Sequence, residues 1–114
     1  MIIDINSLSG DRVYHTLTQT LIPRPVAWVL SDSGESDNLN LAPFSYFTAV
    51  SSKPALLMLS VGKKANGGNK DTLTNILNTK QMVIHIASTE QAELVKTINE
   101  TGNYNDDIEK QLND

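Results

Sequence analysis

At residues 23–30 the sequence reads PRPVAWVL, a stiff proline-flanked segment that leads into a compact apolar run. The proline that follows Arg24 holds the backbone of Arg24 in an extended conformation. The apolar run is rich in β-branched and aromatic residues, which is typical of a strand. Because Trp28 lies within this run, we predict that its side chain packs inside a sheet.

The segments on either side of this strand predict a short helix before it and a hairpin after it. Apolar residues at helical spacing over residues 13–21 indicate a short helix that the first proline interrupts. The turn-rich residues 31–38 connect to a return strand, residues 39–50. Pro43 cannot donate to a ladder, so we expect a bulge or a strand end near the middle of this segment.

The second half of the chain continues with two more strands. Residues 55–61 form a run that is apolar except for Ser60, which is typical of a strand buried on both faces. After a glycine-rich loop at residues 63–70, Asp71 is placed to cap a helix that carries Leu73, Ile76 and Leu77. Residues 81–87 have the composition of another strand.

A second helix is expected near the end of the sequence. Ser88 and Gln91 have the spacing of a capping box, and a helix bearing Ala92, Val95 and Ile98 would close at Gly102. The polar and acidic residues 103–114 are expected to be frayed. The pattern therefore predicts about four strands and two or three helices, which is a mainly β fold with short helices (α+β).

Composition limits the chain to a single domain, residues 1–114, and to a few classes of function. The net charge of −4 and the scattered lysines and arginines offer no basic stripe for nucleic acid. Cysteine is absent, which fits a reducing compartment and makes the cytoplasm the expected location. The longest apolar stretch, residues 55–59, is far shorter than a membrane span of ~20 residues.

Several familiar catalytic patterns are not matched. Gly62 and Gly67 have the spacing of the first part of a phosphate-binding P-loop, but the lysine and hydroxyl residue that must follow the second glycine are missing. His15 and His85 have no ligand-spaced partner, so we interpret both as structural or surface residues and expect no metal site. The sequence identifies no catalytic nucleophile.

Two polar clusters are candidates for ligand binding. In residues 40–52, amide and hydroxyl side chains alternate with aromatic rings around Pro43, an arrangement that can grip a flat heterocycle. A bulged hairpin with a serine-rich turn explains the same residues. In residues 70–72, a lysine and a threonine at a helix start could bind an anion, although helix starts routinely carry such residues for capping alone.

In order along the chain, these motifs resemble the flavin reductase-like, FMN-binding split-barrel family, which includes flavoredoxin-type proteins. The similar segments are PRPVAWV at 23–29, NLAPFS at 40–45, AVSS at 49–52 with Pro54, and KDT at 70–72 with Asn75 and Ile76. The resemblance spans residues 14–75 and continues more weakly to residue 109. It implies a partial split barrel with short flanking helices.

The resemblance also implies a cofactor, FMN, and the residues that bind it. Residues 40–47 would face the ring and ribityl chain, and Ser51, Ser52, Lys70 and Thr72 would lie toward the phosphate. Arg24 would stabilise negative charge on reduced flavin or phosphate, or form a surface ion pair. The candidate cofactor-binding residues are Arg24, Asn40, Ala42, Pro43, Ser45, Tyr46, Phe47, Ser51, Ser52, Lys70, Asp71 and Thr72.

The implied activity is that of an FMN-dependent oxidoreductase, which takes electrons from NAD(P)H through bound flavin to an acceptor. Alternatives are an FMN-binding module or electron carrier without a reductase step, and a fragment that binds nothing. Members of the family continue for several strands beyond the similar region, so we expect a domain that is incomplete at its C-terminus. Its exposed edges would be covered by a second copy, giving a homodimer.

Overall fold

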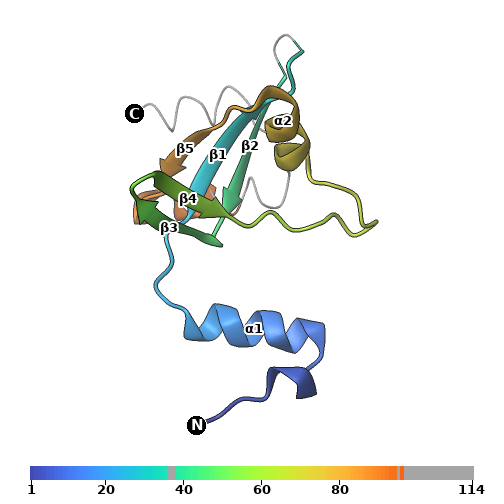
Figure 1. Cartoon of the computed structure of the whole chain (residues 1–114), viewed down its shortest axis with the longest axis vertical. Helices are drawn as coiled ribbons and strands as arrows, with labels where there is room; N and C mark the ends of the chain where they lie inside the picture. Colours follow the sequence, from blue (N-terminus) through green and yellow to red (C-terminus); the bar gives the residue numbers. More distant parts are fainter. Residues whose placement is uncertain (36–37, 95, 97–114) are drawn as a thin grey trace.

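The computed structural model describes residues 1–35, 38–94 and 96 as two antiparallel sheets with short helices (Figure 1). One sheet has three strands in the order β2-β1-β5, and the other consists of β3 and β4. The described residues form no closed barrel. The predicted α+β class is therefore confirmed. In chain order the elements are η1 (Ile5–Ser7), α1 (Gly10–Thr20), β1 (Ala27–Asp32), β2 (Leu39–Phe44), β3 (Phe47–Ser52), β4 (Ala55–Leu59), α2 (Asp71–Thr79), β5 (Val83–Ile86) and η2 (Thr89–Gln91).

The core lies on both faces of the central strand β1. Trp28 is completely buried and packs with Leu41 on one face, while Ala27 and Val29 are equally buried and pack with Phe44 on the other. In the ladder, Trp28 stands opposite Pro43 of β2 and His85 of β5. The predicted burial of Trp28 inside the sheet is confirmed.

The helix α2 packs against β1 and is tied to it by a buried polar pair (Figure 1). The Asn75 side-chain amide donates a hydrogen bond of 3.2 Å to the Ser31 hydroxyl, and both residues are buried. A buried amide needs such a partner, because leaving it unpaired would cost more than the bond itself contributes. This pair fixes α2, and with it the loop that precedes α2, relative to the sheet.

The predicted count of about four strands is wrong, because residues 39–50 form two strands. The strand β2 ends at Phe44, directly after Pro43, and β3 begins at Phe47 in the other sheet. Pro43 stays within the ladder because β2 is an edge strand, where one side of the backbone needs no partner. The expected strand end near Pro43 is therefore confirmed, but the bulge lies further on, between Ala49 and Ser51 of β3.

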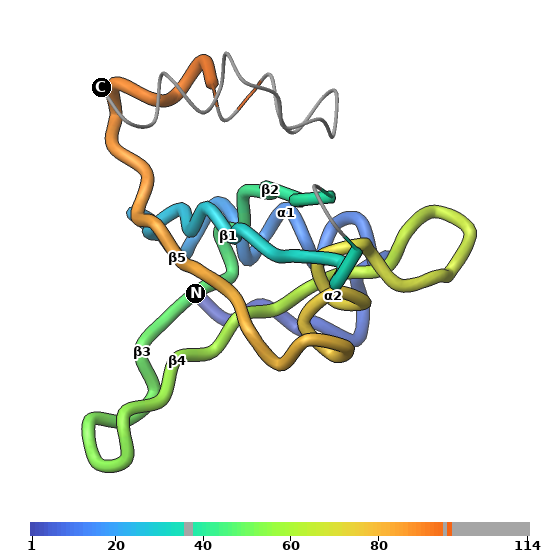
Figure 2. The backbone as a smooth tube through the Cα atoms, turned by 90° about the horizontal axis from the view of Figure 1, so that it is seen from above, coloured from blue at the N-terminus to red at the C-terminus, as the bar shows by residue number. Residues whose placement is uncertain are grey.

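The strand β4 confirms its predicted extended structure but not its predicted burial on both faces. Leu56, Leu57 and Met58 are 49%, 59% and 55% exposed. The physical reason is that β4 pairs with β3 alone, and this hairpin projects away from the three-stranded sheet (Figure 2). The apolar run correctly predicts a strand, but among the described residues no further strand pairs with β4 to bury its apolar side chains.

The start of α2 differs by one residue from its prediction. Lys70 is the N-cap, without a side-chain hydrogen bond, and Asp71 is the first helical residue. The Asp71 carboxylate forms an exposed ion pair of 2.7 Å with Lys64 in the preceding loop, so it is not available as a cap. The favourable position of a carboxylate in the first turn of a helix is nevertheless retained.

The predicted helix start at Ser88 is confirmed by its capping geometry. The backbone N–H of Ser88 donates to the side-chain carbonyl of Gln91 at 3.0 Å, as a capping box requires. The predicted helix continues over residues 92–94 and 96. Its remaining part to Gly102, and the predicted frayed tail 103–114, lie outside the described residues. Among the helices that the structure describes, none combines the length and the apolar character needed to cross a membrane.

Candidate functional site

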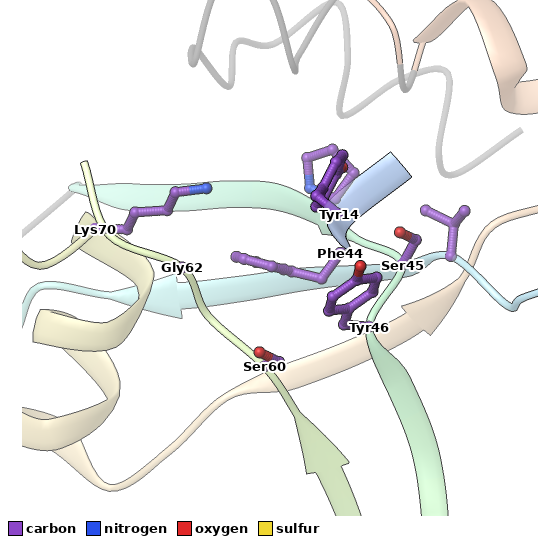
Figure 3. Close-up of a pocket in the computed structure, with 9 residues that line it drawn as sticks. Tyr14, Phe44, Ser45, Tyr46, Ser60, Gly62 and Lys70 are labelled. Carbon is purple, nitrogen blue, oxygen red and sulfur yellow. The ribbon is translucent and has the colours of Figure 1, made fainter. Parts of the chain in front are cut away.

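A cavity of about 450 Å³ lies where β2 ends, between α1, the segment after β4 and the start of α2 (Figure 3). Its volume is within the range of about 300–1,000 Å³ found for pockets that bind small molecules and cofactors. Five separate parts of the chain meet here, at the point where the chain turns from one sheet to the other at residues 45–46. The residues that line the cavity are Tyr14, Val26, Pro43, Phe44, Ser45, Tyr46, Ser60, Gly62 and Lys70.

Aromatic rings dominate one part of the cavity wall. The rings of Tyr14 and Tyr46 have centroids 6.1 Å apart and are tilted by 35°. Phe44 is part of the buried core and lies between Tyr46 and Lys70 in the view of Figure 3. Rings at such separations offer faces and edges to a planar aromatic ligand.

Positive charge lies at the opposite end of the cavity. Lys70 stands at the N-cap of α2, and its ammonium nitrogen is 5.9 Å from the centroid of the Phe44 ring. Within the described part of the chain, this ammonium forms no ion pair. A lysine beside the N-terminal N–H groups of a helix is suited to an anionic group such as a phosphate.

An unsatisfied polar atom is found at the aromatic end. The Tyr46 hydroxyl is buried and has no hydrogen-bond partner among the described residues. Because a buried hydroxyl without a partner costs free energy, a ligand with a polar edge would be stabilised there. The cavity thus combines an aromatic wall, a free hydroxyl and a separate cation, which fits a ligand with a flat polar ring and an anionic tail.

Four of the residues predicted to bind the cofactor meet in this cavity: Pro43, Ser45, Tyr46 and Lys70. Arg24 is not part of the lining, but its guanidinium carbon lies over the ring of Tyr46, which is a lining residue, at 5.8 Å from the ring centroid.

Other predicted residues are engaged with the protein itself. The Asn40 amide donates a 2.9 Å hydrogen bond to the hydroxyl of Thr72, which is 2% exposed, so this pair joins β2 to α2. Ala42 and Phe47 pack against the buried cluster around Phe44. Ala42 and Phe47 therefore belong to the same cluster as Phe44, which lines the cavity.

The two serines predicted to lie toward a phosphate are separated from the cavity in the described chain. Ser51 and Ser52 end β3, at the turn of the projecting hairpin (Figure 2). The Ser51 hydroxyl accepts a 3.2 Å hydrogen bond from the Lys53 backbone, as a turn residue does.

Sequence reasoning missed four residues that line the cavity: Tyr14, Val26, Ser60 and Gly62. Tyr14 was hidden within an amphipathic helix pattern that gave no sign of its distant partner. Ser60 directly follows β4, and Gly62 comes two residues later, after Val61. The appearance of these small residues after a run of large apolar ones was the available signal.

Both histidines lie at the surface, which is one of the two interpretations that the sequence left open. His15 is exposed on α1, with its ring edge toward Tyr14 at 5.7 Å between centroids, and His85 is exposed on β5. Among the residues that the structure describes, no group of three His, Cys, Asp or Glu side chains could hold a metal ion.

Comparison with known proteins identifies the family. A model of the flavin reductase-like domain matches residues 19–111. The chain therefore belongs to the flavin reductase-like domain family, as its motifs indicated. A flavin is the class of cofactor that this family implies, and the function of the chain is flavin-related.

Individual relatives agree with this assignment. The chain is 37% identical over 89 residues to an uncharacterized protein of Aquifex aeolicus, covering 78% of this chain and 45% of that protein. Its fold matches nitrilotriacetate monooxygenase component B of Bacillus cereus with a TM-score of 0.78 and 35% identity, over 90% of this chain and 51% of the other.

A second solved structure is 2-nitrobenzoate 2-nitroreductase of Pseudomonas fluorescens, with a TM-score of 0.73 and 28% identity, over 87% of this chain and 47% of that one. The chain thus spans about half the length of the proteins it matches. Its two open sheets correspond to part of a split-barrel domain.

Proposed function

We propose that this chain binds FMN in the cavity beside Tyr46 and passes electrons from NAD(P)H through the flavin to an acceptor. The observation that carries the proposal is the separation of chemical character along the cavity. Its aromatic end holds the unpartnered Tyr46 hydroxyl, and Lys70 lies at the other end (Figure 3). Membership of the flavin reductase-like family supports the redox chemistry.

Each part of FMN has a group in the cavity that suits it. Tyr46, Phe44 and Tyr14 would hold the ring system, and the Tyr46 hydroxyl would meet its polar edge. Lys70 would hold the phosphate. Ser45 and Ser60 line the cavity and offer hydroxyls to the ribityl chain or the phosphate.

The chain's own residues would bind and orient the flavin and exclude water from it. When bound, the flavin supplies the hydride-accepting and electron-passing chemistry. No nucleophile or metal is required of the protein for this reaction. A cytoplasmic location, proposed from the absence of cysteine, suits a reaction driven by reduced nicotinamides.

A second candidate is an FMN-binding module without its own reductase step, because the groups that line the cavity account for binding of the flavin alone. The two functions are separated by following NADH and NADPH oxidation spectrophotometrically in the presence of FMN and a flavin-reducible dye. Steady oxidation that requires the protein supports the reductase. Saturable flavin binding without oxidation of either nicotinamide supports the module.

We further propose that the chain forms a homodimer that covers the β3–β4 hairpin. Val50, Leu56, Leu57 and Met58 are each about half exposed or more on this hairpin, and apolar strands left unpaired favour association. Light scattering over a dilution series, with and without FMN, should give twice the chain mass. A monomer at every concentration contradicts the proposal.

A further inference from the structure

The helix α1 stands apart from both sheets and none of its residues is buried (Figure 1). Nevertheless it contributes Tyr14 to the cavity. A helix with so little packing takes its position from specific contacts, because burial contributes little to holding it.

Arg24 provides one of these contacts at the C-terminal end of α1. Its terminal nitrogen Nη1 donates hydrogen bonds of 2.9 Å to the Thr18 carbonyl and 2.8 Å to the Leu21 carbonyl. The last turn of α1 contains no basic residue of its own. The guanidinium of Arg24 therefore satisfies free carbonyls and places positive charge at the negative end of the helix.

The same guanidinium also contacts the cavity wall. Its carbon Cζ lies 5.8 Å from the centroid of the Tyr46 ring, a distance at which a cation is attracted to the ring face. The Tyr46 ring in turn lies 6.1 Å from the Tyr14 ring of α1. A chain of contacts thus runs from the C-terminal end of α1 through Arg24 and Tyr46 back to Tyr14 in the first half of the same helix.

We propose that Arg24 is a positioning residue of the flavin site, which docks α1 against Tyr46 so that Tyr14 and Tyr46 close the ring end of the cavity. This inference rests on the proposed flavin function. Arg24 is not part of the cavity lining, so it acts through the two tyrosines and sets how long a flavin ring stays bound. Arginine suits this role because one planar group donates hydrogen bonds and contacts an aromatic face together.

The proposal predicts a specific pattern of ligand effects. Arg24 acts on the wall that meets the ring, and FMN and riboflavin share that ring. Removal of Arg24 should therefore speed the dissociation of both flavins by the same factor, about tenfold, as two charge-assisted hydrogen bonds and a cation–ring contact are lost.

The test compares Arg24→Ala with Arg12→Ala, which removes the same charge from an exposed position near the start of α1. Hydrogen exchange in the flavin-free protein reports on the last turn of α1, where the Leu21 N–H bonds to the Leu17 carbonyl. Stopped-flow fluorescence then gives the dissociation rates of FMN and riboflavin. We expect faster exchange and faster release of both flavins for Arg24→Ala, and neither for Arg12→Ala.

Arg24→Lys covers the case in which Arg24→Ala does not fold. Lysine can donate to the helix carbonyls but cannot also lie across the Tyr46 ring, so we expect near-normal exchange in α1 with faster flavin release. The proposal is overturned if hydrogen exchange at the end of α1 is equal in Arg24→Ala and Arg12→Ala. It is also overturned if Arg24→Ala speeds the dissociation of FMN but not that of riboflavin. If the unmodified chain takes up no flavin, the proposed function fails, while exchange still decides whether Arg24 positions α1.

Discussion

Replacing Trp28 with alanine should lower the free energy of unfolding by about 3–5 kcal/mol, as expected when a large buried aromatic side chain is truncated. Trp28 is completely buried in the centre of the sheet and packs with Leu41, Leu30 and Ala87. The remaining side chains could not fill the space that the indole leaves. An effect of this size is a large fraction of the total stability of a small domain.

The measurement is urea denaturation followed by far-ultraviolet circular dichroism at a fixed chain concentration, because association would change the apparent stability. Ile2→Ala is the matched control, since Ile2 is 98% exposed and its truncation should cost less than about 0.5 kcal/mol. Trp28→Phe should lower the free energy of unfolding less than Trp28→Ala does. Phenylalanine keeps an aromatic ring and removes the buried Nε1, which has no partner in the described chain. Equal midpoints for Trp28→Ala and Ile2→Ala would be incompatible with a core centred on β1.

Lys70→Ala should weaken FMN binding roughly 10- to 150-fold and leave riboflavin binding nearly unchanged, because a charged hydrogen bond to phosphate contributes about 1.5–3 kcal/mol. Lys70 lines the cavity at the start of α2, where its ammonium and the helix N–H groups act on an anion together. Riboflavin has the same ring and ribityl chain as FMN but no phosphate. The difference between the two ligands therefore isolates the phosphate contact.

The control for this prediction is Lys53→Ala, which removes the same charge from the exposed turn between β3 and β4. Isothermal titration or flavin fluorescence gives both dissociation constants for each variant. If Lys70→Ala weakens the binding of FMN and riboflavin equally, Lys70 lies away from the phosphate. If Lys53→Ala weakens FMN binding as much as Lys70→Ala does, the effect comes only from the net charge of the chain.

Much of the fold could be predicted because its decisive signals are local. The proline-flanked run that contains Trp28 defines β1, and the Ser88–Gln91 spacing defines the helix start after β5. The passage from β2 to a strand of the other sheet was not predicted. The two connecting residues, Ser45 and Tyr46, include no glycine, and the preceding Pro43 remains within the ladder. The exposure of β4 could not be predicted. An apolar run indicates that a strand is buried, but it does not indicate whether the same chain or another chain buries it.

The candidate site was predicted in part for the same reason. Pro43, Ser45 and Tyr46 are consecutive or nearly so, and a local polar and aromatic pattern identified them. The pairing of Asn40 with Thr72 is not local: 32 positions separate the two residues, and the Asn40 amide donates a hydrogen bond to the Thr72 hydroxyl. Tyr14 likewise meets Tyr46 only through the fold, so its place in the cavity wall had no signal in the sequence around it.

The central claim is that the cavity between Tyr46 and Lys70 is a flavin site, and titration of the flavin-free, folded chain with FMN tests it most directly. Flavin fluorescence with equilibrium dialysis gives the stoichiometry, and circular dichroism establishes that the chain is folded. We predict saturable binding of one FMN per chain, tighter than that of riboflavin, with a raised melting temperature at saturation. A folded chain that takes up no FMN, and whose melting temperature FMN leaves unchanged, would contradict the account.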